Sequence, residues 1–133
     1  MIKEAYVSLE VAKLLKEKGF NEKCRGGYHS EFDDNDNSII MLEEWTAQPY
    51  NNDFVDEGFL CSAPTHQMAI AWLREVHHIA INIGWGEIFE DQYKWWSIVL
   101  NMDSGDILCE YDYHISYEQS CEAALKYCLE NLI

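Results

Sequence analysis

Apolar residues recur at helical spacing in three separate segments of this chain, and the stretches between them favour β-strands. This alternation constrains the fold more than any other feature, because the helices and strands of a small domain must bury their apolar faces against one another. A chain of 133 residues fits a single domain with a substantial core. We therefore predict one α+β domain over residues 1–133. It has two layers, with about three helices on one face of a mostly antiparallel sheet, in the order α-β-β-α-β-β-β-α.

The first helix is predicted between Ser8 and Gly19. Ser8 is a favourable N-cap residue, and Gly19 supplies the left-handed conformation that commonly ends a helix. Phe20 directly after this glycine matches a Schellman ending, in which Phe20 packs back on Leu15. The apolar stripe of this helix consists of Leu9, Val11, Ala12, Leu14 and Leu15.

Two further helices are predicted from their start signals. Pro64 and Thr65 mark the beginning of the second helix, which ends near His77 or His78. The third helix begins at Ser116, which forms a capping-box pair with Gln119. Their apolar faces are Ala69, Trp72, Leu73 and Val76 in the second helix and Tyr117, Cys121, Ala124, Leu125, Cys128 and Leu132 in the third.

The β-favouring runs predict five strands, and turn-forming residues separate them. Asp34–Asn37 provide the turn of the first hairpin, because Asn and Asp tolerate left-handed backbone conformations. Thr46–Gly58 is predicted to be a surface loop, Gly84–Gly86 to break the third strand, and Asp103–Gly105 to form the last turn. The predicted strands are residues 28–32, 39–45, 79–83, 93–100 and 107–113.

The net charge of -15 and the pI near 4.5 restrict the classes of partner. Residues 26–73 contain nine Asp and Glu residues and no Lys or Arg. Such a field opposes direct binding to nucleic-acid phosphates or to an anionic membrane surface. We expect a protein partner with a basic surface, or a role for the charge in solubility alone.

The remaining composition indicates a cytoplasmic protein. No apolar run approaches the roughly 20 residues that cross a bilayer, and the first residues mix charged with apolar side chains, unlike a signal peptide. The cysteines are odd in number and lack a C-x-x-C pair, so reduced thiols are expected rather than a disulfide framework. These cysteines are Cys24, Cys61, Cys109, Cys121 and Cys128.

Three stretches carry a resemblance to a known group of proteins. They are SLEVAKLLKEKGFNEKC at Ser8–Cys24, CSAPTHQMAIAWLREVH at Cys61–His77 and YEQSCEAALKYCLENLI at Tyr117–Ile133. In these stretches the chain resembles a group of small uncharacterised proteins of Bacteroides-type gut bacteria and of their phages and mobile elements. The resemblance implies a bacterial or phage cytoplasmic protein. It implies no activity, cofactor or catalytic residue.

One acidic stretch has a spacing similar to that of a calcium-binding loop. Asp33, Asn35, Asn37 and Glu44 stand at the first, third, fifth and twelfth places of such a loop. Ser38 occupies the place where the sharp turn needs glycine, and no helix precedes the segment. We therefore favour a solvated hairpin turn over a calcium site.

Histidines and cysteines suggest two further kinds of site, and we favour a structural role over both. A zinc site would need distant ligands such as Cys24, His29 or His114, because the histidines on or beside the second helix lack the i, i+4 spacing of a metal pair. Cys61 with His66 could form a nucleophile and its base, but free cysteines are among the most buried residue types. The histidines of the second helix are His66, His77 and His78.

The partner surface predicted from the sequence combines carboxylates with aromatic rings. Trp95 and Trp96 are adjacent on one strand and must face opposite sides of the sheet, so at least one lies away from the helix layer. Our leading hypothesis is a non-enzymatic protein-binding or regulatory module of phage or mobile-element origin. The alternatives are an acidic decoy that imitates DNA and an enzyme whose site is not recognised. The predicted surface residues are Asp33, Asp34, Asp36, Trp95 and Trp96; no catalytic residue, cofactor or metal ligand is predicted.

Overall fold

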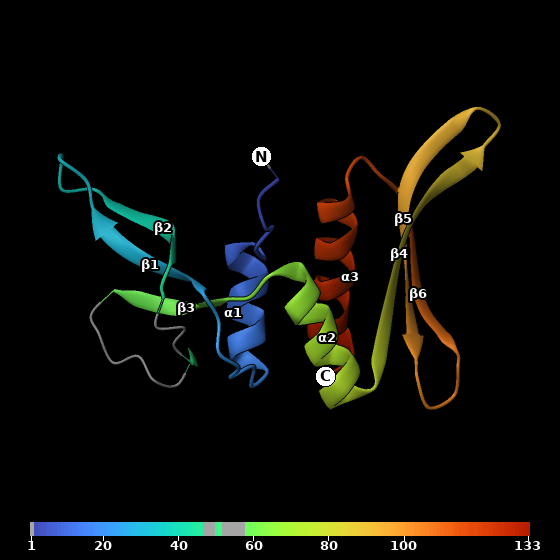
Figure 1. Ribbon diagram of the computed structural model, residues 1–133, viewed down its shortest axis with the longest axis horizontal. Coiled ribbons are helices and arrows are strands. Elements are labelled where there is room, and N and C mark those ends of the chain that lie inside the picture. The colour runs from blue at the N-terminus through green and yellow to red at the C-terminus, as the bar shows by residue number, and fades with distance from the viewer. Residues whose placement is uncertain (1, 47–49, 52–57) are drawn as a thin grey trace. The chain divides into compact units, whose positions relative to one another are not determined.

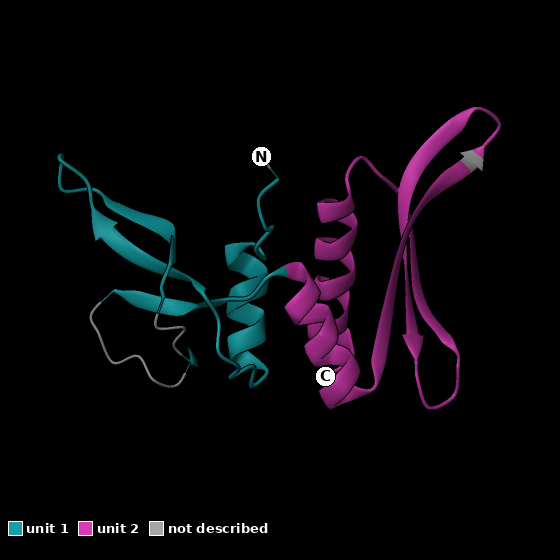
Figure 2. Cartoon of the chain, viewed as in Figure 1, with its two compact units in different colours: residues 1–65 teal, residues 66–133 magenta. Residues whose placement is uncertain are grey.

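The fold was analysed in a computed structural model, which describes residues 2–46, 50, 51 and 58–133, with the backbone alone at residue 88. The chain divides into two compact units, Met1–Thr65 and His66–Ile133 (Figure 2). Helices and antiparallel strands alternate as predicted, so the α+β class is confirmed. The strands form two three-stranded sheets, one in each unit, where the sequence had indicated one.

Unit 1 contains one helix and three strands within its described residues (Figure 1). They are α1 (Leu9–Glu17), β1 (Gly26–Phe32), β2 (Ser38–Glu44) and β3 (Phe59–Ala63). The predicted hairpin is confirmed, because β1 pairs with β2 in antiparallel register from Gly26 opposite Glu44 to Phe32 opposite Ser38. The strand β3 was not predicted, and it pairs with the other side of β1, which makes β1 the central strand.

The ends of α1 follow the predicted caps. The Ser8 hydroxyl accepts a hydrogen bond from the Val11 amide at 3.2 Å. Gly19 has a φ of +94°, and the Phe20 amide donates to the Leu15 carbonyl at 2.9 Å, as in a Schellman ending. Phe20 is buried, so the chain turns back onto the helix at this point.

Most of the predicted loop Thr46–Gly58 lies outside the described residues. Its residue Asn51 is described, and this side chain is buried instead of lying on the surface. The side-chain Nδ2 of Asn51 donates to the Phe20 carbonyl at 2.7 Å, and its Oδ1 accepts from the Ser62 backbone amide at 2.6 Å. Asn51 thus links the end of α1 to β3, which explains its burial.

Unit 2 places its two helices on one face of its sheet (Figure 1). Its elements are α2 (His66–His77), β4 (Ile79–Phe89), β5 (Gln92–Asn101), β6 (Ile107–His114) and α3 (Tyr117–Asn131). The strands lie in the order β4-β5-β6, and both pairings are antiparallel. None of the helices in the described part of the chain is both long and apolar enough to cross a bilayer.

The core of unit 2 comes from alternate strand residues and from the helix stripes. Most residues of the predicted apolar stripes of α2 and α3 are buried. Val76 near the end of α2 and Tyr117 at the start of α3 are exposed. Ser120 and Leu129 are buried in α3 although they were not predicted to be. The buried strand residues are Ile79, Ile81, Ser97 and Val99, which share one sheet face.

The predicted break at Gly84–Gly86 is wrong, because β4 runs through both glycines without interruption. Gly84 lies directly opposite Trp96 on β5. A Cβ atom at residue 84 would overlap the indole ring of Trp96, so glycine is needed here to make room for the ring. Gly84 therefore serves the cross-strand packing of β4 and β5.

The capping box of α3 is confirmed with one difference. The Ser116 hydroxyl accepts from the Gln119 amide at 3.1 Å, as predicted. The Gln119 side chain accepts from the amide of Ile115, one residue before the cap, at 3.2 Å. Two backbone donors at the start of the helix are satisfied in this way.

We expect Ser116→Ala to lower the free energy of unfolding by about 1 kcal/mol, because the Gln119 amide loses its acceptor. Urea unfolding followed by circular dichroism measures the effect. Ser116→Thr keeps the hydroxyl and is the matched control, so it should lose much less stability. Equal stability of Ser116→Ala and the native protein would show that this cap contributes nothing.

Candidate functional site

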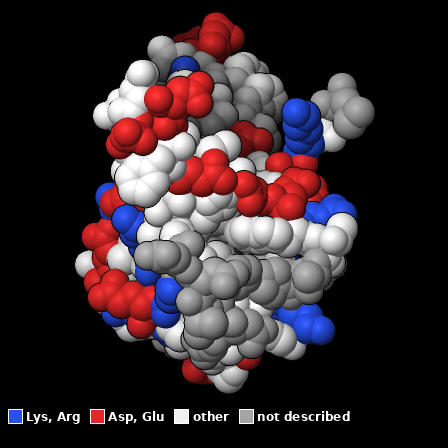
Figure 3. Space-filling view, turned by 90° about the vertical axis from the view of Figure 1, so that its left-hand side faces the viewer, with Lys and Arg blue, Asp and Glu red and all other residues white. Residues whose placement is uncertain are grey.

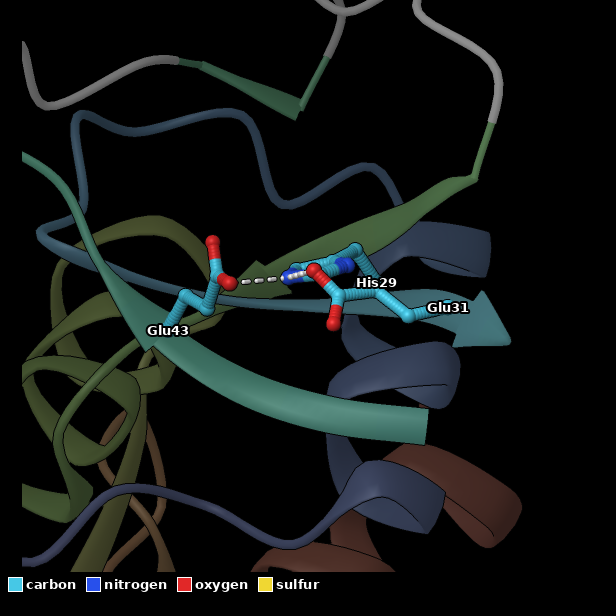
Figure 4. A group of neighbouring side chains, drawn as sticks. All are labelled: His29, Glu31 and Glu43. Atoms are coloured by element: carbon cyan, nitrogen blue, oxygen red, sulfur yellow. Dashed lines mark ion pairs between the residues drawn. The ribbon is translucent and has the colours of Figure 1, made fainter. Parts of the chain in front are cut away.

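The hairpin of unit 1 brings one histidine and two glutamates together (Figure 4). His29 and Glu31 are two residues apart on β1, so their side chains lie on the same face of the sheet. Glu43 lies on β2, where its cross-strand partner is Gly27, which places it diagonally next to His29. The three side chains form what we call the His29 cluster.

The His29 ring is the most buried member of the His29 cluster. Its side chain is 13% exposed, while those of Glu31 and Glu43 are 48% and 38% exposed. The Nε2 atom of His29 lies 2.5 Å from Oε1 of Glu43 and 3.6 Å from Oε1 of Glu31. The Nε2 atom is buried, and both contacts are within ion-pairing distance.

Electrostatics favour the protonated form of His29. Its interaction with the Glu43 carboxylate raises the pKa of His29 above the ordinary value of 6.5, against the opposing effect of burial. A hydrogen bond with the Ser30 backbone raises this pKa further. The two carboxylates beside the ring therefore stabilise a positive charge on His29.

The His29 cluster predicts a pH dependence of stability. Because the folded-state pKa of His29 is raised, its contribution is fully present below about pH 6.5 and is lost as the pH rises through the folded-state value. We expect the melting temperature of the native protein to exceed that of His29→Gln by more at about pH 6 than at about pH 9. Differential scanning calorimetry measures both, and a gap independent of pH would contradict this account.

The acidic loop predicted as a partner surface, Asp33 to Asp36, forms the turn of the β1–β2 hairpin. The Asp33 carboxylate accepts from the amides of Asn35 and Asn37, each at 2.9 Å. These hydrogen bonds lower the pKa of Asp33. Asp36 has a φ of 61°, as the turn requires. Figure 3, which views the molecule from the side of unit 1, shows carboxylates gathered in several groups.

The calcium-like spacing does not bring its ligands together. The Asp33 carboxylate is engaged by its own turn, as the favoured hairpin interpretation predicted. Glu44 stands at the other end of β2, about 20 Å along the strand from that turn. Its carboxylate accepts instead from the Tyr6 hydroxyl at 2.8 Å. The residues of the calcium interpretation are therefore spread along a hairpin.

The two predicted tryptophans lie on opposite faces of the unit 2 sheet, and both are only partly exposed. Trp95 meets Tyr117 at the start of α3 edge-on, with ring centroids 5.5 Å apart. Trp96 packs over Gly84 on the other face. Neither ring is as exposed as Trp85 and Tyr93, which the sequence had indicated only as members of a larger set of aromatic residues able to line a partner groove.

Exposed aromatic rings gather at the end of the β4–β5 hairpin, which projects beyond α3 (Figure 1). Trp85 and Tyr93 are 58% and 49% exposed, and their rings stack with centroids 5.0 Å apart. Phe89 is as exposed as Trp85, and the centroid of its ring lies 5.7 Å from that of Tyr113. We call residues 85–93 of this hairpin the aromatic tip.

The aromatic tip also contains acidic residues. Glu87, Glu90 and Asp91 lie within it, while Lys94 is the single Lys or Arg between residues 75 and 125. The Glu87 carboxylate also accepts from the Asp91 amide at 2.8 Å, which fixes the turn. The aromatic tip thus offers flat apolar surface and negative charge at the same place.

Burial governs the chemistry of most cysteines. Burial raises the pKa of the Cys61 and Cys121 thiols to about 11 and that of Cys24 and Cys128 to about 12. A thiol in this state is protonated near neutral pH and is a poor nucleophile. The structure therefore favours the structural interpretation of Cys61 over a catalytic one.

All five cysteines are free in the structure, and that their thiols stay reduced is a prediction. We expect a thiol count of five per chain when freshly purified protein is unfolded without reductant. Counting before and after treatment with reductant is the internal control. A reproducible count of three or fewer would contradict the reduced state.

Two histidine pairs in unit 2 involve buried side chains. His66 is buried, and its Nε2 atom lies 2.8 Å from Oε1 of Glu122. Ser120 Oγ lies 3.0 Å from Nδ1 of His114, which resembles a nucleophile with its base. Ser120 is completely buried, so a substrate could not reach this oxygen. Both pairs are therefore best explained as internal polar contacts.

The zinc ligands considered from the sequence are not assembled as a set. Among the described residues, the group that can converge on a metal ion contains His29 with Glu31 and Glu43, and neither Cys24 nor His114. No protein family, curated protein or solved structure matches this chain.

Proposed function

We propose that this protein is a non-enzymatic binding module that takes up a basic protein segment on the aromatic tip of unit 2. The observation that carries the proposal is the stacked, half-exposed pair of Trp85 and Tyr93 on a projecting acidic hairpin. Exposed aromatic clusters are uncommon on surfaces without a partner, and Trp and Tyr supply much of the binding energy at protein interfaces.

The chemistry of the partner follows from the charges beside these rings. Arginine side chains stack on Trp and Tyr faces and pair with carboxylates at the same time. Glu87, Glu90 and Asp91 supply those carboxylates, and their negative field raises the rate of encounter with a basic segment. An Arg-rich segment therefore matches the aromatic tip better than an acidic or purely apolar one.

The proposal is tested with a labelled synthetic peptide that contains four arginines, measured by fluorescence anisotropy. In the counterpart peptide citrulline replaces arginine, which keeps the shape and removes the charge. We expect saturable binding of the arginine peptide that weakens as salt rises, and roughly tenfold or weaker binding of the citrulline peptide. Equal binding of the two peptides would overturn the choice of partner.

Two charge variants separate the aromatic tip from the acidic turn of unit 1. Glu87→Gln/Glu90→Gln/Asp91→Asn and Asp33→Asn/Asp34→Asn/Asp36→Asn each remove three negative charges and keep side-chain size. We expect the first to weaken arginine-peptide binding roughly tenfold and the second to change it less than about twofold. Equal losses would show that binding depends on the net charge and not on the aromatic tip, as expected for a general acidic decoy.

A further inference from the structure

We propose that His29, Glu31 and Glu43 form a binding site for a divalent transition-metal ion, with zinc as the ion that the donor set fits best. The site lies in unit 1 and is separate from the proposed peptide-binding function of unit 2. One imidazole nitrogen and two carboxylate oxygens are ordinary zinc ligands, and three protein ligands with an open fourth position are common in zinc sites.

The strands hold these ligands in a defined arrangement. His29 and Glu31 project from the central strand β1, and Glu43 projects from its hydrogen-bonded neighbour β2. The pairing of β1 with β3 shifts register between Tyr28 and His29, and such bulges commonly redirect a side chain at a functional site. The ligand atoms already lie within 4.8 Å of one another.

Aromatic packing supports the histidine from one side. Gly27 lies opposite Glu43, and the ring of Trp45 occupies the space that a side chain at residue 27 would fill. The ring centroids of Trp45 and His29 are 6.3 Å apart. The imidazole is therefore held in place, while the more exposed glutamates can adjust by small rotations.

The buried nitrogen of His29 faces the two carboxylates of the site. Nε2 is shielded from water and lies 2.5 Å from Oε1 of Glu43 and 3.6 Å from Oε1 of Glu31, so one nitrogen and two oxygen donors face one another. Zinc bound by Nε2 and the two carboxylates would require only a modest outward movement of the Glu43 carboxylate.

The charges around the site favour a cation. No Lys or Arg occurs between residues 26 and 73, and the ion pairs of Glu31 and Glu43 found among the described residues are both to His29. A metal ion held by His29 and the two carboxylates would meet no Lys or Arg from this stretch of the chain. Because zinc binds the unprotonated forms of these ligands, zinc affinity should fall as the pH is lowered.

The site is tested by isothermal titration of the full chain with zinc chloride, with magnesium chloride as the comparison ion. We expect one zinc site per chain and no comparable magnesium binding, because magnesium prefers an all-oxygen, octahedral shell. His29→Gln and Glu43→Gln should each weaken zinc binding roughly tenfold or more. His78→Asn is the matched control, since His78 also lies beside a carboxylate, that of Asp103 at 3.3 Å, but is exposed.

Three results would overturn the site. They are no saturable zinc binding up to about 1 mM, unchanged affinity in His29→Gln and Glu43→Gln, and equal weakening in His78→Asn. Circular dichroism of the metal-free variants checks the fold, and Glu31→Gln replaces any variant that fails to fold.

Cobalt(II) provides a second measurement, because its absorption spectrum distinguishes nitrogen and oxygen ligands from a cysteine thiolate. A thiolate band in the cobalt-loaded protein would assign the metal to a cysteine and overturn the proposal.

Discussion

Replacing Gly84 with alanine is expected to lower the free energy of unfolding by about 2 kcal/mol. The added methyl group would overlap the indole ring of Trp96, which lies directly opposite on β5. Either the ring leaves its position or the two strands move apart, and both changes lose packing. Chemical unfolding monitored by tryptophan fluorescence measures the loss.

Gly86 offers the matched control within the same strand. A Cβ atom at residue 86 would meet only Nε1 of Trp96, at the ordinary contact distance of 3.9 Å. Gly86→Ala should therefore change stability by less than about 0.5 kcal/mol. In a Trp96→Leu background the cost of Gly84→Ala should shrink, because the clashing ring is absent. Equal costs for the two glycine substitutions would refute the packing role of Gly84.

The double substitution Trp85→Ala/Tyr93→Ala is expected to weaken arginine-peptide binding by roughly tenfold to a hundredfold. Both rings are about half exposed and stack on each other, so their removal takes away the flat surface with little effect on the core. Fluorescence anisotropy with the labelled arginine peptide measures the loss. The melting temperature should change little, which separates a binding defect from unfolding.

Substitution of a different exposed pair controls for general loss of apolar surface. Ile39 and Met41 on β2 are also exposed, at 38% and 39%, and belong to unit 1. Ile39→Ala/Met41→Ala should leave peptide affinity within about twofold of the native value. If the two double variants lose affinity equally, the aromatic tip has no special role.

Local signals predicted the helices and their ends well. Ser8, Gly19 and Ser116 act through hydrogen bonds or backbone conformations within a few residues. Their effect can therefore be predicted from the neighbouring residues in the sequence. The turn near Asp34–Asn37 was predictable for the same reason. The division of the strands between two sheets was not, since strand pairing joins residues that are distant in sequence.

Gly84 shows why a pattern can mislead. A glycine that ends a strand and a glycine that makes room for a cross-strand ring look identical in sequence. Only the register, which places Gly84 opposite Trp96, distinguishes them. The strand β3 was missed because its five residues run directly into Pro64 and carry little periodicity.

The His29 cluster could have been found from the predicted hairpin. His29 and Glu31 are two residues apart on the first strand, so they share one face of the sheet. Counting across the turn places Glu43 beside them on that face. The zinc set considered from the sequence instead joined His29 to distant residues such as Cys24 and His114. The aromatic tip was harder to predict, because the exposure of Trp85 and Tyr93 depends on how far the hairpin extends past α3.

The most direct test of the proposed function is a nuclear magnetic resonance titration of the isotope-labelled full chain with the arginine peptide. We predict that the largest saturable shifts fall on the indole signal of Trp85 and on the backbone amides of Glu87, Asp91 and Tyr93. The signals of Asp33 and Asp36 in unit 1 should move little. Shifts centred on residues 33–36, or spread evenly over all acidic segments, would contradict the proposal that the aromatic tip is the binding site.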